Sequence, residues 1–443
     1  MVAAHVEIGV RQPLLERVSD ARRRSDELFN MVRADSIYER PIPERHRIIF
    51  YLGHLEAFDW NLLHENVFGL ASFHLEFDKL FAFGIDPVGG GLPSDQPSEW
   101  PSLESVKDYV NRIRTALDEK LADGILDSSA HRRDGFPLYT LLNVAIEHRL
   151  MHVETLAYML HQLPVDRKIR PADPPNLIAP PVIHRMVPIP AGVATLGLSR
   201  VDSTFGWDNE YEAHTAQVPA FQIDQHMVTN RQFLEFISAG GYDTRSFWSD
   251  DDWNWKTAKG IRHPVLWKAA NNKWLYRTMF DEVPLPVDWP VYVSHAEASA
   301  YARWAGKQLP TEEEWHRAAY GSGDGERHYP WGNEPPKSNL GNFDLDRWDP
   351  APVNAFPQGQ SAFGVQGMVG NGWEWTSSVF APFPGFEPFP FYRGYSADFF
   401  DGKHFVMKGG SPRTAACMLR PTFRNWFQAH YQYVYAGFRC ISS

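Results

Sequence analysis

The chain has 443 residues, more than one compact core holds, which predicts two or three domains. Hydrophobic residues make up 43% and charged residues 22%, as in soluble globular proteins. The net charge of −11 argues against a protein that wraps nucleic acid or lies on an anionic membrane. Only two cysteines occur, Cys417 and Cys440, which excludes a disulfide framework and a Cys-rich zinc or iron–sulfur site.

The N-terminal stretch is charged and lacks the apolar segment of a signal peptide. No run approaches the roughly 20 apolar residues that span a bilayer. We therefore expect a cytoplasmic location, with no membrane partner.

Residues 1–165 are predicted to be helical. Apolar residues recur at helical spacing in four segments: 14–32, 45–69, 102–124 and 135–163. Four helices with moderate connections indicate a bundle, a fold that builds metal sites from side chains facing its core. The six prolines between Pro164 and Pro181 favour an extended linker, which we place at residues 166–185.

Residues 186–443 show a different pattern of short strands, turns and many Trp and Gly. Three helices are predicted there by capping boxes, each followed by glycine at the helix end: Thr229 with Gln232, Ser294 with Glu297, and Thr311 with Glu314.

The stretch IEHRLMHVET, residues 146–155, places His148 and His152 one helical turn apart. The pair either addresses a single metal ion or forms a polar stripe. Its apolar surroundings favour the metal, because buried imidazoles need partners. A zinc-protease site is excluded, since that motif needs Glu directly after the first His and Arg149 stands there.

A third ligand is available in FYLGHLEAFDWNL, where His54 lies within an apolar helix segment. His64 and His74 are competitors, but both lie nearer helix ends and polar neighbours. Three imidazoles leave open positions on the ion and suit iron, zinc or copper.

These features resemble a known family. The lone helical His54 followed by HRLMHVE is similar to the DinB-like domain of the ergothioneine-biosynthesis sulfoxide synthases. The second half resembles the formylglycine-generating-enzyme/sulfatase-modifying-factor domain, a variant of the C-type-lectin fold. It does so in MVPIPAGVATLG, PVYVSHAEASAYARWAGKQLPTEEEWHRAAYG, MVGNGWEWTSS and RPTFRNWF. The resemblance implies an α+β protein, with a four-helix DinB-like bundle at 1–165 and a lectin-like domain at 186–443.

The resemblance further implies that His54, His148 and His152 hold a non-haem Fe(II). The implied reaction joins a thiol to the imidazole of hercynine (N-alpha-trimethylhistidine), consumes dioxygen and leaves a sulfoxide.

Asn425 and Trp426, in RNWF, fall where the family contacts hercynine, and an aromatic face suits a quaternary ammonium. Members that use gamma-glutamylcysteine carry an acidic residue and an arginine where Phe427 and Tyr431 stand here, which favours free cysteine. Met151 replaces a glutamine that often precedes the second metal histidine of those members and helps orient hercynine.

A tyrosine donates a proton or hydrogen in the family, and FPFYRGYSADFF offers Tyr392 and Tyr395 for that role. We expect Trp373, Glu374 and Trp375 to be scaffold, as also Gly409, Gly410 and Ser411. Cys417 and Cys440 do not resemble the copper-binding pair of true formylglycine generators.

Three alternatives remain open at the level of sequence. One is a selenoneine synthase with a selenosugar donor. Another is a DinB-like thiol transferase whose zinc or nickel only activates a thiol. The last is a binding module with structural histidines. The oligomeric state is not encoded in any pattern that we recognise.

Overall fold

The computed structural model describes residues 2–82, 92–122, 132–172, 177–201, 204–271 and 273–442, with side chains from residue 14 onwards. The chain divides into two compact units, Met1–Pro171 and Ala172–Ser443. β3 begins at Met186, and residues 173–176 of the predicted linker lie outside the described residues.

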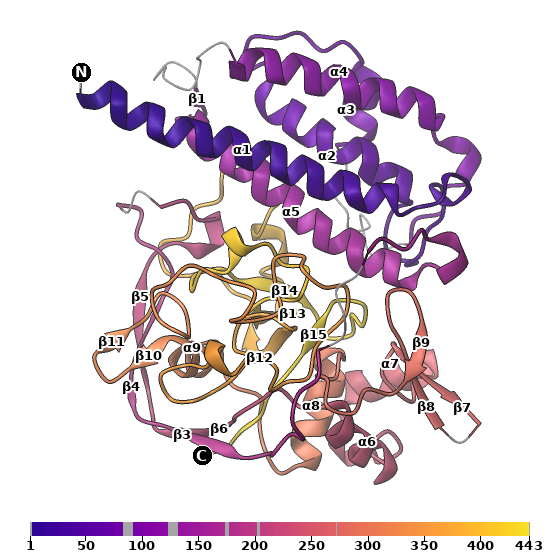
Figure 1. The fold of residues 1–443 in the computed structure, drawn as a ribbon, viewed down its shortest axis with the longest axis vertical. Helices are drawn as coiled ribbons and strands as arrows, with labels where there is room; N and C mark the ends of the chain where they lie inside the picture. Colours follow the sequence, from indigo (N-terminus) through magenta and orange to yellow (C-terminus); the bar gives the residue numbers. More distant parts are fainter. Residues whose placement is uncertain are drawn as a thin grey trace. The chain divides into compact units, whose positions relative to one another are not determined.

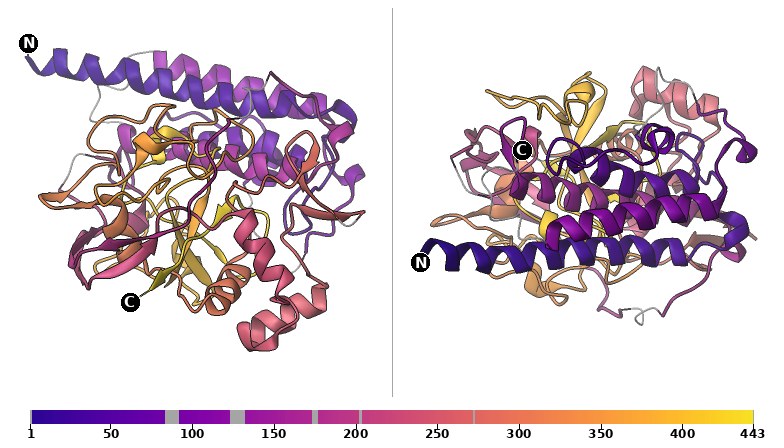
Figure 2. Two further views of the ribbon diagram at one scale, coloured as in Figure 1. Left: turned by 60° about the horizontal axis from the view of Figure 1, so that its bottom comes forward. Right: turned by 90° about the horizontal axis from the view of Figure 1, so that it is seen from above.

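The first unit is helical. Its helices are α1 (Val2–Asn30), α2 (Ile48–Leu63), α3 (Leu75–Leu80), α4 (Leu103–Ala122) and α5 (Leu138–Gln162). Figures 1 and 2 show the long helices running side by side, with α1 against α5 and α2 against α4 and α5. The predicted bundle is therefore confirmed. The short α3 was not predicted, and the predicted end of the third helix at Gly124 lies outside the described residues.

Burial explains the different compositions of these helices. α4 covers one side of the bundle and buries residues at a spacing of three and four: Val106, Tyr109, Val110, Ile113, Leu117 and Leu121. α2 and α5 are instead buried around most of their circumference. Polar side chains on these two helices are thus forced into the core, where each needs a partner.

In its described residues, the second unit is built from small sheets and four α-helices. Its largest sheet has the order β14-β13-β12-β15, formed by Asn425–Gln428, His404–Lys408, Trp373–Val379 and Ala436–Gly437. The other sheets are β16-β6-β3 (Ile441–Ser442, Phe221–Asp224, Met186–Ile189), β7-β8-β9 (Trp267–Ala270, Lys273–Arg277, Glu282–Pro284), β4-β5 (Gly192–Leu196, His214–Val218) and β10-β11 (Gly321–Ser322, Gly325–Glu326). The helices are α6 (Asn230–Ser238), α7 (Asp250–Lys259), α8 (His295–Trp304) and α9 (Glu312–Tyr320). The predicted α+β class is confirmed.

The three predicted capping boxes all form, at the starts of α6, α8 and α9. α6 and α8 are followed by left-handed glycines, Gly240 (φ 77°) and Gly306 (φ 66°), as the sequence predicts. α9 differs, because Gly321 at its end is extended. There the lack of a side chain serves close packing, since a Cβ would lie 2.5 Å from the carbonyl oxygen of Arg317.

A buried ion pair holds the centre of the second unit. Glu374 on β12 accepts hydrogen bonds from Arg439 at 2.6 Å and from the Trp315 indole at 2.8 Å, and all three side chains are fully buried. Trp373 and Trp375 flank Glu374 in the core. The scaffold role predicted for this segment is confirmed, and Gly409 and Gly410, both at positive φ, are backbone features as expected.

Among the described residues, no helix combines the length and apolarity that a membrane crossing requires.

His295, at the start of α8, makes the stability of the second unit depend on pH. Its imidazole donates to the Thr376 carbonyl oxygen (3.1 Å) and stacks on Phe405 at 3.8 Å. Burial lowers the pKa of His295 from its usual 6.5 to about 4. Between these values the unfolded chain binds more protons than the folded one, so lowering the pH favours unfolding.

We therefore predict that the His295→Gln variant, which retains a donor for Thr376, loses less unfolding free energy between pH 7 and pH 5 than the wild type. The difference is expected to be about 2 kcal/mol, measured by urea unfolding. The exposed His328, changed to Gln, is the matched control. Equal pH slopes for wild type and His295→Gln would contradict the prediction.

Candidate metal centre and aromatic cluster

Three histidines meet inside the helical unit, one from α2 and two from α5. His148 and His152 lie one turn apart on α5, which has no internal proline and ends at Gln162, just before Leu163 and Pro164. His54 lies in the middle of α2. All three side chains are buried, and one ligand atom from each lies within 4.8 Å of the others.

The ring nitrogens point at one another. His152 Nε2 is 3.2 Å from His54 Nε2 and 3.1 Å from His148 Nε2. His54 Nδ1 lies 2.7 Å from the carbonyl oxygen of Phe81, so this nitrogen carries the proton and donates it. His54 Nε2 consequently keeps its lone pair, directed at the other two rings. A donor to a backbone carbonyl on the far side of the ring is the usual support of a metal-binding histidine.

Burial also keeps the three imidazoles neutral. It is the largest cause that lowers the pKa of His54 to about 4, and it lowers the pKa of His148 and His152 well below 6.5. Neutral imidazole is the form that binds metals. Three neutral nitrogen donors around one point fit a borderline transition metal such as iron, zinc or copper.

Aromatic rings orient the histidines and exclude water. Phe58 stacks on His148 with ring centroids 3.4 Å apart, and Phe50 stacks on His54 at 4.8 Å. Tyr51 lies 5.8 Å from His152. Met151, half-buried, precedes His152 on α5.

The competing histidines do not belong to this group. His64 Nδ1 bonds to the carbonyl oxygen of Trp60 at 2.8 Å, and His74 caps α3 by accepting from the Phe77 amide. Arg149 does not act as the base of a protease, because its guanidinium is charged and pairs with Glu56 and Asp59.

In the second unit, the residues predicted to bind substrate lie on β14. Trp426 stacks on Phe380 with centroids 4.1 Å apart and planes at 6°, and its amide donates to the Asn425 side-chain oxygen at 2.8 Å. Phe427 stacks on Tyr431 at 4.9 Å. The three predicted residues are all half-buried, which leaves part of each ring or amide accessible.

Both candidate tyrosines join the same aromatic cluster. Tyr395 is buried, stacks on Trp207 at 4.0 Å and meets Trp426 edge-on at 5.4 Å. Tyr392 lies 5.6 Å from Tyr395 and 6.4 Å from Trp207. The sequence does not indicate Trp207 as a member, because no local pattern relates it to a tyrosine 188 positions later.

Buried ion pairs hold β14 in place. Arg424 donates to both oxygens of Glu312, at 3.0 and 3.1 Å, and its guanidinium lies 4.9 Å from the Phe380 ring. Lys408 on β13 donates to the carbonyl oxygens of Pro421 and Phe423, and burial lowers its pKa to about 8. Trp426 therefore projects from a strand whose start is fixed by charge-assisted hydrogen bonds.

Comparisons with known proteins agree with both halves. Residues 17–156 match the DinB superfamily, and residues 178–443 match the family described as sulfatase-modifying factor enzyme 1-like domain. The DinB-like and sulfatase-modifying-factor assignments made from sequence are thereby confirmed.

Three curated relatives are similar over long stretches. A hercynine oxygenase of Mycolicibacterium smegmatis is 37% identical over 304 residues, covering 67% of this chain and 70% of the relative. One of Mycolicibacterium thermoresistibile is 43% identical over 252 residues, covering 55% of each chain. Ergothioneine biosynthesis protein 1 of Neurospora crassa is 30% identical over 500 residues, covering 93% of this chain and 55% of the relative. The matched stretches thus span about half the length of two of these three relatives.

The geometry predicts that His152→Ala abolishes stoichiometric metal binding, because His152 Nε2 is the atom nearest to both other ring nitrogens. Binding of Fe(II) or Co(II) is measured by anaerobic titration and metal analysis. His64→Ala is the matched control and is expected to bind normally. Stoichiometric binding by the His152→Ala variant would show that the metal lies elsewhere.

Proposed function

Because the chain belongs to the family of ergothioneine-biosynthesis proteins, joining a DinB superfamily domain to a sulfatase-modifying factor enzyme 1-like domain, we propose that it is a non-haem iron, dioxygen-dependent sulfoxide synthase. Its substrates are hercynine, cysteine and dioxygen. The observation that carries the proposal is the convergence of three buried, neutral imidazoles on one point. The cytoplasmic location stays a prediction.

The reaction balances without a further reductant. Hercynine gives up a ring C–H hydrogen and cysteine its S–H hydrogen, and a C–S bond forms. One oxygen atom of dioxygen ends on sulfur and the other leaves as water with those two hydrogens. Dioxygen accepts four electrons, two from formation of the C–S bond and two from oxidation of the sulfur.

His54, His148 and His152 are the residues that we assign to Fe(II). When bound, the iron would supply open positions for the thiolate and dioxygen and the redox change that dioxygen needs. The chain itself orients the histidine rings and keeps water away from them. The Phe81 carbonyl fixes the His54 tautomer, while Phe50 and Phe58 shield the rings.

Asn425, Trp426 and Phe427 are assigned to substrate binding, with Met151 on α5 as a further contact. The ring of Trp426, held flat against Phe380, offers the polarisable face that a trimethylammonium group prefers. Phe427 and Tyr431 stack on each other and supply no charge for the additional carboxylate and amine of gamma-glutamylcysteine. Free cysteine is therefore the proposed donor.

The direct test is aerobic incubation of the Fe(II)-loaded protein with hercynine and cysteine, followed by mass spectrometry. We expect a product with the mass of both substrates joined, minus two hydrogens and plus one oxygen. An anaerobic reaction and one with gamma-glutamylcysteine run in parallel. Turnover without dioxygen would identify a thiol transferase instead, and preference for gamma-glutamylcysteine would overturn the donor assignment.

We assign the proton donor to Tyr395 rather than Tyr392, because Tyr395 is the one that contacts Trp426. The Tyr395→Phe variant keeps the stack on Trp207 but loses the hydroxyl. It is predicted to form at least tenfold less sulfoxide per dioxygen consumed, with cysteine oxidation taking its place. Tyr392→Phe is the control, and an unchanged product ratio in Tyr395→Phe would exclude the assignment.

A further inference from the structure

The metal centre is divided between two helices, and one arginine binds them to each other. Arg149 directly follows His148 on α5. Its Nη1 donates to Glu56 Oε1 at 2.9 Å, and its Nη2 donates to Asp59 Oδ2 at 2.7 Å and to the Leu55 carbonyl oxygen at 3.2 Å. All these acceptors lie on α2 within five residues of His54. One side chain of α5 therefore holds the segment of α2 that carries His54.

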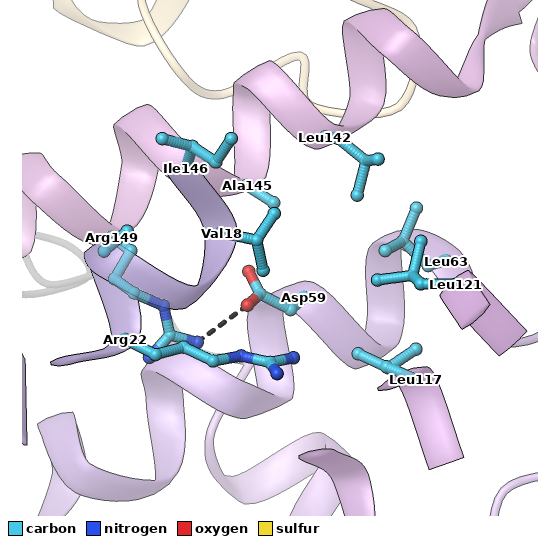
Figure 3. A pocket seen from close by; sticks show the side chains of 11 residues that line it. Val18, Arg22, Asp59, Leu63, Leu117, Leu121, Leu142, Ala145, Ile146 and Arg149 are labelled. Carbon is cyan, nitrogen blue, oxygen red and sulfur yellow. Dashed lines mark hydrogen bonds and ion pairs between the residues drawn. The ribbon is translucent and has the colours of Figure 1, made fainter. Parts of the chain in front are cut away.

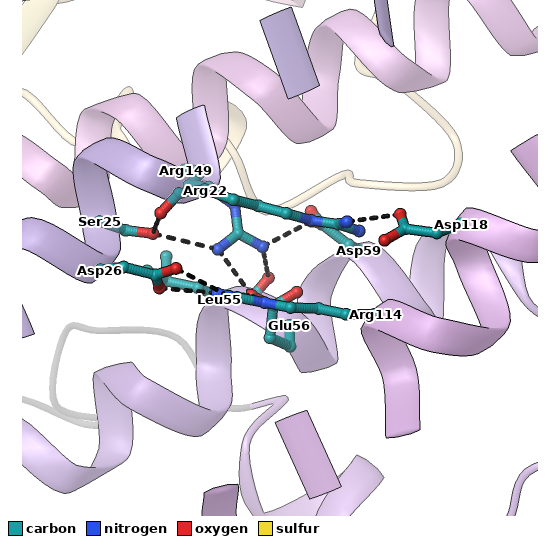
Figure 4. A network of polar contacts seen from close by, with 9 residues as sticks. All are labelled: Arg22, Ser25, Asp26, Leu55, Glu56, Asp59, Arg114, Asp118 and Arg149. Carbon is teal, nitrogen blue, oxygen red and sulfur yellow. Dashed lines mark hydrogen bonds and ion pairs between the residues drawn. The ribbon is translucent and has the colours of Figure 1, made fainter. Parts of the chain in front are cut away.

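Two further helices, α4 and α1, are tied to the same network. Arg114 on α4 donates to Glu56 Oε1 at 2.8 Å and pairs with both oxygens of Asp26 on α1, also at 2.8 Å. Ser25 on α1 accepts from Arg149 at 3.3 Å. Figure 4 shows Arg149 and Arg114 both reaching Glu56, and the network as a whole links α1, α2, α4 and α5.

Stability alone does not explain this arrangement. Arg149 and Glu56 are almost completely buried, and taking both charges out of water offsets much of their attraction. Among the described residues, Glu56 Oε2 and Asp59 Oδ1 have no hydrogen-bond partner. The network borders a small cavity whose lining is mostly apolar, with Leu63, Leu117 and Leu142 among its walls (Figure 3). Apolar side chains would suit such surroundings at least as well.

The charged contacts fix the register between α2 and α5. Apolar helix faces pack in several neighbouring registers, whereas a planar guanidinium bridging Glu56 and Asp59 fits one. Sliding α2 by one residue displaces His54 by about 1.5 Å, which is large against nitrogen–metal distances of about 2.0–2.1 Å.

We propose that Arg149 is a positioning residue for the three-histidine centre: its fork to Glu56 and Asp59 sets the register of α5 on α2, and with it the approach of His54 to His148 and His152. This inference rests on the metal centre of the proposed function.

The test uses Co(II) as the probe, because its visible bands report coordination geometry without turnover. Arg149→Lys keeps the charge but not the fork, and it is predicted to bind Co(II) about tenfold more weakly. The triple variant Arg149→Met, Glu56→Met, Asp59→Leu removes every charge of the fork. It is predicted to unfold in urea at a midpoint no lower than that of the wild-type apo-protein, yet to bind Co(II) about 10- to 100-fold more weakly with shifted bands.

Arg22→Met is the matched control, since Arg22 pairs with Asp118 between α1 and α4. Its Co(II) affinity should stay within about twofold of wild type, well short of the roughly 10- to 100-fold loss that follows when a residue supporting a metal ligand is removed. A triple variant with wild-type affinity and spectrum overturns the inference, and so does one that fails to fold, since the network would then serve the fold itself. Failure of the wild type to bind Co(II) would instead overturn the proposed function, and this inference with it.

Discussion

The helical unit depends on the burial of three imidazoles where water cannot reach them. Burial keeps the pKa of each ring low and leaves the imidazoles neutral, while His152 Nε2 lies 3.2 Å from His54 Nε2 and 3.1 Å from His148 Nε2. Such an arrangement is unfavourable until a cation or an equivalent partner lies among them. The apolar circumference of α2 and α5, the stacked phenylalanines and the Phe81 carbonyl all serve to maintain that constraint.

Local patterns account for what the sequence could predict. Helical periodicity places His148 and His152 on one face. Apolar neighbours distinguish His54, as the third candidate ligand, from His64 and His74. Capping boxes mark the starts of α6, α8 and α9 because their hydrogen bonds involve residues three apart. Contacts between distant residues have no such signature. The Arg149 fork reaches back 90 to 94 positions, and Trp207 meets a tyrosine far along the chain, so neither was foreseen.

The two units solve the problem of buried charge in the same way. In the second unit, Arg424 with Glu312 and Arg439 with Glu374 are enclosed, and each fixes a strand of the largest sheet. In the first unit the corresponding pairs fix helices. In both, the paired charges are distinct from the residues assigned to chemistry, which are imidazoles in the first unit and mostly aromatic side chains in the second.

The distribution of sulfur has a practical consequence for spectroscopy. Residues 1–171 contain no cysteine, and Cys440 is enclosed in the second unit, where burial raises the pKa of its thiol well above the ordinary value. Cys417 alone is exposed. With that one side chain changed to serine, a thiolate-to-metal charge-transfer band in the loaded protein would come from an added thiol. The binding of a sulfur donor can thus be observed directly, without a background band from the protein's own thiols.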